Sequence, residues 1–213
     1  MTPVGLLLPG RDELALSAVT SKVTSDCLVD ILCRWWEINK ARFPRVKTLL
    51  LNFDNGPECH SRRTQFLSRR VAFVAKTGIT LDLLHNSPLP SHRAFGCNLI
   101  FLHYARGLLQ LAYYPPYHSK YNPVERCWGV LENHWNGDLL DSVATVLAFA
   151  RSMTWKGTHP TVELMTKTYP LGVRLTQKAM AVLETKVHRL PGLGKWFVEI
   201  RPDTLSDGRI IYS

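Results

Sequence analysis

The chain has 213 residues, which is enough for one sizeable core and too few for two comfortable domains. It is 46% hydrophobic and 20% charged, a composition typical of a globular protein. Lys and Arg number 26 against 17 Asp and Glu, giving a formal net charge of +9. This excess favours an anionic partner, nucleic acid before a membrane, although a basic protein without such a partner has the same charge.

The cysteines are far apart in the sequence and form no CxxC pair, and Cys59-His60 has no partner pair at zinc-finger spacing. Zinc is therefore not expected, and isolated thiols suit a reducing cytosol. The apolar run at Leu6–Leu8 is short and Arg11, Asp12 and Glu13 follow it at once. We predict neither a signal peptide nor a membrane span, and we expect a cytoplasmic protein.

The first part of the chain, residues 1–23, is weakly patterned, and we interpret it as a ragged amino-terminal end. A helix is predicted from Thr24, with Ser25 or Asp26 as its cap. Its apolar stripe recurs in steps of three and four residues at Leu28, Ile31, Leu32, Trp35 and Trp36. Aromatic residues at this spacing belong to a core far more often than to a surface on which nucleotides stack.

A continuous apolar run at 46–53 predicts a strand that is buried on both faces. It ends in Asp54-Asn55-Gly56-Pro57, which is turn chemistry and places Asp54 at the carboxyl end of the strand. Ligands gather at such strand ends in open α/β sheets, so Asp54 is a candidate metal ligand and Asn55 a weaker one. The alternative is an ordinary Asx turn that caps the next helix.

The helix predicted over residues 61–76 carries four arginines, and Phe66, Phe73 and Val74 form its apolar stripe. The arginines, which we place on its polar positions, are Arg62, Arg63, Arg69 and Arg70. Four guanidinium groups close in sequence suit contacts with DNA phosphates, which do not read bases. A solvated helix face explains the same pattern equally well.

A second candidate acid follows the rigid, proline-rich loop at 115–123. Asn122 and Pro123 suit the cap and first position of a helix, and Val124, Trp128 and Leu131 give this helix a buried side. Glu125 then lies in the first turn. It either compensates the helix dipole, a common use of Glu, or acts as a metal-binding carboxylate beside a strand end.

Basic residues flank Glu125 on both sides. Lys120 can meet a phosphate as a compact positive charge, and Arg126 adds a second charge at the rim of the acidic site. His118 either acts similarly or fills space. The pattern is sensible for a site at which metal ions and DNA meet.

The rest of the chain predicts further α/β elements. Residues 138–153 read as a helix with Leu139, Val143, Val146, Leu147 and Ala150 on its buried side. Thr176 caps a predicted helix that runs to Val187, residues 196–200 read as a closing strand, and residues 201–213 as a loose tail.

Two segments together resemble a known family. A strand ending in Phe-Asp-Asn-Gly, followed later by Pro-Pro-Tyr-His-Ser-Lys-Tyr-Asn-Pro-Val-Glu, resembles the DDE transposase superfamily, and within it the ISAzo13-type insertion-sequence transposases. Residues 25–36 and the segment Thr168-Tyr169-Pro170-Leu171-Gly172 are also similar to that family. The resemblance covers most of residues 24–200, which we take as the catalytic domain.

The resemblance implies an RNase H-like fold, in which a mixed sheet is flanked by helices. It also implies two Mg²⁺ or Mn²⁺ ions and the metal-dependent cleavage and transfer of DNA strands in transposition. Asp54 matches the second acid of the family and Glu125 the third. DNA is the implied partner, with a homo-oligomer assembled on it and a nucleoid-associated location.

The chain departs from the family in two places. The family has a first Asp on its opening strand, whereas Asp12 and Glu13 lack the flanking pattern, so we do not place that acid and expect an amino-truncated chain. Residues 78–110 begin one strand twice and read as an insertion or aberrant segment, and we interpret His85, His92 and His103 within it as incidental. Both departures favour the alternative of a catalytically inactive DNA-binding remnant; a nuclease without transposition is a third possibility.

Overall fold

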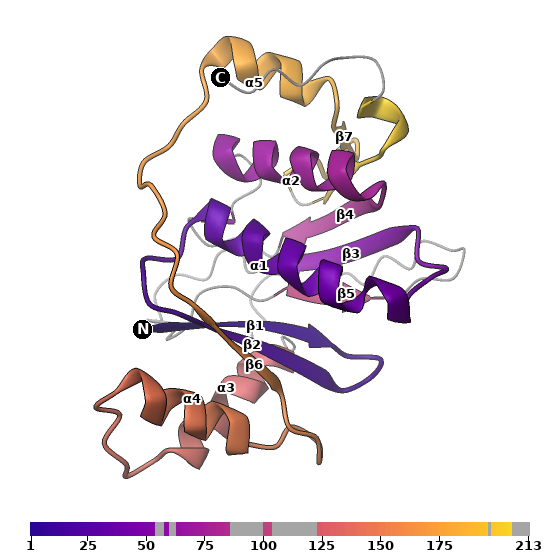
Figure 1. Ribbon diagram of the computed structural model, residues 1–213. Coiled ribbons are helices and arrows are strands. Elements are labelled where there is room, and N and C mark those ends of the chain that lie inside the picture. Colours follow the sequence, from indigo (N-terminus) through magenta and orange to yellow (C-terminus); the bar gives the residue numbers. More distant parts are fainter. Residues whose placement is uncertain (54–57, 60–62, 86–99, 104–122, 196, 206–213) are drawn as a thin grey trace.

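The computed structural model describes residues 1–53, 58–59, 63–85, 100–103, 123–195 and 197–205. Within these residues the chain forms an eight-stranded mixed sheet in the order β6-β2-β1-β5-β3-β4-β8-β7, with helices on both sides (Figure 1). The strands are β1 (Thr2–Leu8), β2 (Glu13–Val19), β3 (Thr48–Phe53), β4 (Thr80–His85), β5 (Ile100–His103), β6 (Thr161–Met165), β7 (His188–Arg189) and β8 (Phe197–Ile200). The helices are α1 (Ser25–Asn39), α2 (Thr64–Thr77), α3 (Pro123–His134), α4 (Val143–Ser152) and α5 (Gln177–Glu184), with short 3-10 turns at Lys40–Arg42 and Asp203–Leu205.

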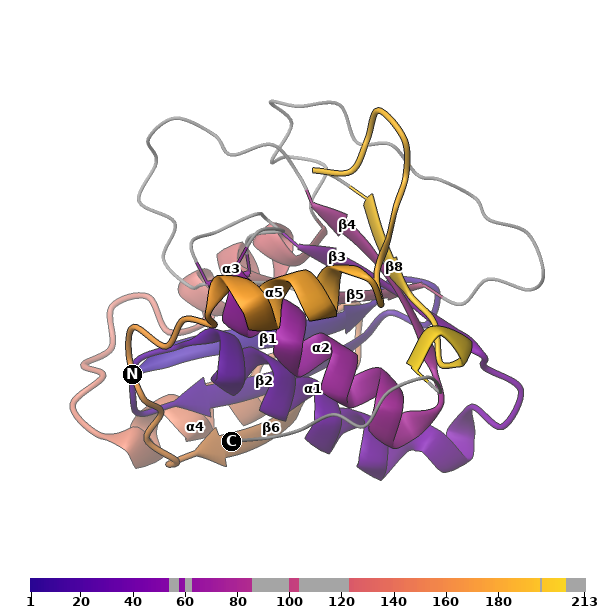
Figure 2. The same cartoon turned by 90° about the horizontal axis from the view of Figure 1, so that it is seen from above.

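The helices divide between the two faces of the sheet. Helices α1 and α2 lie side by side on one face, and α5 lies beyond α2 (Figures 1 and 2). Helices α3 and α4 lie on the opposite side, against β1, β2 and β6. The predicted α/β class is therefore confirmed, and the RNase H-like assignment within this class stays a prediction.

The larger hydrophobic core fills the space between the sheet and the pair α1–α2. Alternate residues of the central strands point into it, among them Leu51, Phe53 and Leu83, together with Trp35 and Trp36 of α1. A second core, with Leu7, Trp128 and Leu131, fills the other side beneath α3 and α4. The sheet thus separates two cores, as the alternation of side chains along a strand requires.

The expectation of a ragged amino-terminal end is wrong. Residues 2–19 form the antiparallel hairpin β1–β2, in which Thr2 pairs with Val19 and Leu8 with Glu13. The tight turn is closed by Arg11, whose N–H donates to the Leu8 carbonyl at 3.0 Å, and by Asp12 at a positive φ of 55°. Both strands lie inside the sheet, because β1 pairs with β5 and β2 with β6.

Several predicted elements are confirmed with shifted ends. Helix α1 begins at Ser25 and is capped by Thr24, one residue before the first of the two predicted caps, since the Thr24 hydroxyl accepts from the Cys27 N–H at 3.3 Å. Thr176 caps α5 in the same way, through the Ala179 N–H at 3.2 Å. Helix α2 starts at Thr64, three residues later than expected, and ends at Gly78, which adopts a left-handed φ of 68°.

Helix α4 differs from its prediction in both extent and orientation. It begins at Val143, capped by Ser142, whose hydroxyl accepts from the Thr145 N–H at 3.0 Å. Leu139 precedes the helix and is 80% exposed, and Val143 is 40% exposed, although both were expected on the buried side. The serine cap sets the helix start, so the helical periodicity assumed from residue 138 does not apply to Leu139.

The segment 78–110 supplies two strands of the sheet in its described parts. β4 pairs with β3 in parallel, and β5 lies between β1 and β3, parallel to β1 and antiparallel to β3. The apolar run in the second half of this segment therefore has a partner on each side. Whether the segment is an insertion stays a prediction.

Candidate functional site

The carboxyl end of β3 is held rigidly against α2. Phe53, the last residue of the strand, is buried, and its ring meets Phe66 edge-on with the ring centroids 5.1 Å apart. Asp54 follows directly in the sequence, but it lies outside the described residues, as does Asn55. The structure confirms the buried strand that leads to Asp54.

Helix α3 starts at Pro123, as the sequence predicts, so Glu125 is its third residue. Val124, Cys127, Trp128 and Leu131 are buried and form one face of the helix, which packs on β1 and β2. The side chain of Glu125 lies outside the described part of the structure. The helix that carries this residue is nevertheless anchored to the sheet over two turns.

The strand register brings these two elements to the same part of the sheet. Phe101 of β5 stands opposite Leu7 of β1 on one side and opposite Asn52 of β3 on the other. Two residues before Leu7, the Trp128 ring of α3 lies against Gly5, where an added Cβ would come within 3.2 Å of it. The end of β3 is thus level with the region of β1 that α3 covers, two strand spacings or about 10 Å away.

Two side-chain oxygen atoms on the α3 side of the sheet, Oδ1 of Asn52 and Oδ1 of Asp82, are buried and have no hydrogen-bond partner among the described residues. Since Leu50 pairs with Asp82 and Asn52 with Leu84, the two side chains stand on the same face, on neighbouring strands. Burial and then the nearby Glu199 carboxylate raise the pKa of Asp82 to about 6.

Asp82 and Asn52 are not among the site residues predicted from the sequence. The pattern that could have indicated them is a single polar residue inside an apolar strand, as in Thr80-Leu81-Asp82-Leu83-Leu84. A buried, unpaired oxygen acceptor is costly and calls for a proton, a water molecule or a cation. The face of the sheet nearest the candidate site therefore has unused oxygen ligands.

The two acids closest to the start of the chain are engaged elsewhere. Asp12 pairs with Lys156, with 2.7 Å between Oδ1 and Nζ. Glu13 pairs with Arg42 at 2.6 Å and lies near Arg11. Both carboxylates sit at the β1–β2 turn, and the structure gives neither of them a free position for a first catalytic acid.

Arg69 was expected to face DNA phosphates, but it links two helices instead. It pairs with Asp26, at 3.1 Å between Nε and Oδ1, and with Asp30, both on α1. Asp30 also accepts from Lys167 at 2.7 Å and from the Tyr169 hydroxyl at 3.1 Å. This network holds α1, α2 and the Thr168-Tyr169-Pro170 segment together, which explains that segment by packing rather than by chemistry.

The expectation that Arg70 lies on the polar side of its helix is wrong. The side chain is completely buried, stacks on Phe66 with 4.3 Å between the guanidinium carbon and the ring centroid, and donates from Nε to the Phe66 carbonyl at 3.2 Å. Burial lowers the pKa of its guanidinium. Helix α5 packs beyond α2 and encloses this side of it, so Arg70 cannot reach a phosphate at the surface.

Of the other residues predicted to contact DNA, the structure describes Arg63 and Arg126. Arg63 pairs with Glu58 at 3.0 Å at the start of α2 and keeps 28% of its side chain exposed. Arg126 is exposed on α3, next to Glu125. Arg62 and Lys120 lie outside the described residues, as does His118.

The described residues lack both a metal-binding cluster and a helix suited to a membrane. They contain no group of three or more His, Cys, Asp or Glu side chains that could hold a metal ion. None of their helices combines the length and the apolar character needed to cross a membrane. The metal-site result leaves Asp54 and Glu125 untested, because neither side chain is among those described.

A mixed α/β domain that carries an acid directly after a central strand and a second acid at the start of an anchored helix is compatible with a DDE domain. The family model described as the Rhodopirellula transposase DDE domain matches the chain over residues 1–96 and 92–202. The chain therefore belongs to this family, and its resemblance to ISAzo13-type DDE transposases is confirmed. The two matched stretches meet inside the 78–110 segment. No curated protein and no solved structure matches the chain.

Proposed function

We propose that this chain is the catalytic domain of a DDE transposase, with an RNase H-like arrangement, and that it cleaves and transfers DNA strands during transposition of an insertion sequence. Membership of the family supports the class of enzyme. The observation that carries the assignment to this chain is the register that sets the end of β3 level with the part of β1 covered by α3. The two acids thereby belong to elements at the same level of the sheet, two strand spacings apart, which supports the proposal.

In this proposal, Asp54 and Glu125 hold Mg²⁺ or Mn²⁺. The donor chemistry fits, because these hard ions take oxygen ligands and keep several waters, so few protein ligands suffice. Asn52 is the residue before Phe53 at the end of β3, and its buried Oδ1 has no partner among the described residues. This oxygen supports an oxygen-rich environment at this strand end. When bound, a pair of such ions stabilises the attacking and leaving oxygens of an in-line displacement at phosphorus.

DNA contacts in this proposal come from the exposed Arg126, from Lys120 and Arg62, and in part from Arg63. Arg69 and Arg70 are excluded from this role, because the first is neutralised by two aspartates and the second is buried. Phosphate contacts of this kind position the duplex without reading its sequence. Binding should weaken as the salt concentration rises, because counterions are released on binding.

The test is metal-dependent nicking of a duplex that carries the ends of the element. Wild-type protein should nick this duplex with Mg²⁺ or Mn²⁺ and not with EDTA. Asp54→Asn and Glu125→Gln should each lower the rate by more than about 100-fold, the scale of losing a group that stabilises charge in the transition state. Circular dichroism and thermal unfolding should show that both variants keep the fold.

The matched control is Glu37→Gln, which changes an exposed acid on α1, away from β3 and α3. Its nicking rate should equal that of wild type. Unchanged nicking in Asp54→Asn or in Glu125→Gln would remove that residue from the site, and unchanged nicking in both would refute the proposal.

The second candidate function is a DNA-binding remnant without catalysis. It is favoured by one specific observation, that Asp12 and Glu13 are held in ion pairs with Lys156 and Arg42. This candidate predicts salt-sensitive DNA binding with no metal-dependent cleavage. Wild-type protein that binds the duplex and never nicks it would support the remnant over the transposase.

A further inference from the structure

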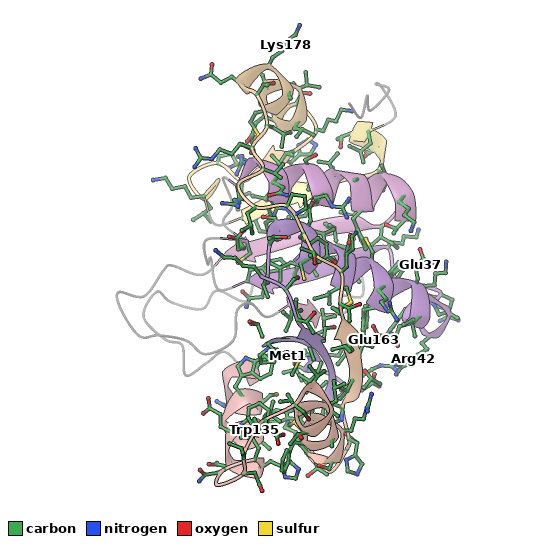
Figure 3. The ribbon with its side chains drawn as sticks, turned by 60° about the vertical axis from the view of Figure 1, so that its left-hand side comes forward. Met1, Glu37, Arg42, Trp135, Glu163 and Lys178 are labelled. Atoms are coloured by element: carbon green, nitrogen blue, oxygen red, sulfur yellow. The ribbon has the colours of Figure 1, made fainter. Side chains whose placement is uncertain are left out.

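Most of the exposed apolar side chains among the described residues gather in two segments, one that forms α3 and α4 and one that leads into α5 and continues past it. Ten large apolar side chains are exposed among the described residues, and seven of them lie in two regions. The first region, residues 123–153 with α3 and α4, holds Val130, Leu139, Leu140 and Val143. The second, residues 171–195 with α5, holds Leu171, Val173 and Val182. Figures 1 and 3 place the pair α3–α4 and helix α5 at opposite ends, with Trp135 near one end and Lys178 near the other.

The two ends carry opposite charges within a basic protein. Residues 123–153, here the acidic pole, contain four Asp and Glu against two Arg. Residues 171–195, here the basic pole, contain five Lys and Arg against one Glu. Glu132, Asp138 and Asp141 of the acidic pole are all exposed, as are Arg174, Lys178 and Lys195 of the basic pole. Surfaces of opposite sign that also expose apolar side chains are complementary.

The acidic pole also contains a groove. A cavity of about 270 Å³ opens between the β1–β2 strands and the pair α3–α4. Its apolar walls include Leu16, Trp128, Trp135 and Leu140, and Glu132 stands at its side. Leu139, the most exposed large apolar residue described, is next to Leu140 in the sequence. An apolar groove with a carboxylate at its side suits an apolar side chain with a positive charge beside it.

Helix α5 of the basic pole presents that combination. Lys178 and Val182 are four residues apart in the helix, so they lie on the same face. Both are exposed, Val182 to 55%. The helix packs on α2 through its other side. The face with Lys178 and Val182 is free to enter a groove on another molecule.

We propose that this protein associates with itself head to tail, and that the α5 face of one copy docks into the α3–α4 groove of the next. The two surfaces lie at opposite ends of one molecule, so they can meet only between copies. A contact between two different surfaces is heterologous, and it generates closed rings or open chains rather than an isolated symmetric dimer. The proposal concerns assembly alone and holds whether or not the protein cleaves DNA.

The test uses purified protein without metal or DNA and measures sedimentation over a range of concentrations. Wild-type protein should form species larger than a dimer, and raised salt should weaken them because the charges at the contact are exposed. Val182→Asp disables the basic pole, and Leu140→Lys disables the acidic pole. Each should weaken self-association by about tenfold or more.

The decisive experiment mixes these two variants. Val182→Asp keeps an intact groove and Leu140→Lys keeps an intact α5 face, so the mixture should give a one-to-one heterodimer that grows no further. The control is Ile38→Asp, which changes a residue 62% exposed at the end of α1, outside both poles, and should associate as wild type does. Wild-type protein that stays monomeric, variants that associate normally, or a mixture that stays monomeric would each overturn the proposal.

Discussion

The two faces of the central strands differ in chemistry. Toward α1 and α2, the described side chains of strands β3, β4 and β8 are apolar, namely Leu49, Leu51, Phe53, Leu81, Leu83, Val198 and Ile200. On the opposite face, the same strands present Asn52, Asp82 and Glu199, the last two directly opposite each other. Burial of apolar surface stabilises the first face. The second face buries oxygen atoms at a cost to stability, which indicates that it is the face with capacity to bind.

The largest expected change in stability comes from a substitution on the apolar face, toward α1 and α2. Phe66→Ala removes a ring that is fully buried between α2 and the sheet and that contacts both Phe53 and Arg70. We expect the free energy of unfolding to fall by about 3–5 kcal/mol, the usual cost of such a truncation. Urea unfolding followed by circular dichroism measures this loss. A loss below about 1 kcal/mol would show that the α1–α2 side is not the main core.

A smaller loss of stability is expected when an ion pair between α1 and α2 is removed. Arg69→Met keeps the bulk of the side chain but leaves Asp26 and Asp30, each about one-fifth exposed, without their shared cation. We expect a loss of about 2 kcal/mol in the free energy of unfolding. The control is Arg174→Met, an exposed arginine, which should change it by less than about 0.5 kcal/mol. Equal values for the two variants would mean that the network contributes nothing.

On the face that carries Asn52, Asp82 and Glu199, we expect a substitution to raise the free energy of unfolding instead of lowering it. Burial and the Glu199 carboxylate raise the pKa of Asp82 to about 6 in the folded protein, from 3.8. The folded state then holds this proton more tightly than the unfolded state, so stability falls as pH rises from about 4 through 6. Asp82→Asn should remove this penalty and raise the free energy of unfolding at neutral pH by about 2 kcal/mol.

The measurement for Asp82→Asn is urea unfolding at two pH values, one acidic and one neutral. The variant should be more stable than wild type at neutral pH, and the difference should shrink toward zero near pH 4, where Asp82 is protonated in both states. A variant less stable than wild type at neutral pH would show that the Asp82 carboxylate has a partner that stabilises it.

The elements that could be predicted from the sequence are those specified locally. The Thr176 cap, the start of α1 close to Thr24 and the apolar run before Asp54 each depend on residues within a few positions. Strand β6 was not predicted, because its place depends on pairing with β2, which is some 145 residues away in the sequence: Ala15 pairs with Thr161. The hairpin β1–β2 was missed because its strands are buried on both faces and lack the alternation of a half-buried strand.

The candidate site shows the same division. The strand before Asp54 and the helix that contains Glu125 were predicted from local patterns and are present. Burial of Arg70 could not be predicted, because it depends on α5, which packs on α2 from more than 100 residues further along the chain. Asp82 likewise acquires its raised pKa from burial in the sheet and from Glu199 across the β4–β8 pair, and both depend on distant parts of the chain.

The contact between Gly5 and Trp128 ties together positions that are distant in the sequence. A methyl group at position 5 would meet the indole at 3.2 Å, tighter than most such contacts, so the ring would have to give way slightly. The indole belongs to a helix whose inner side packs on the sheet, so the strain would fall on α3, which also carries position 125. Among relatives of this chain, residues larger than glycine at position 5 should therefore occur together with side chains smaller than tryptophan at position 128.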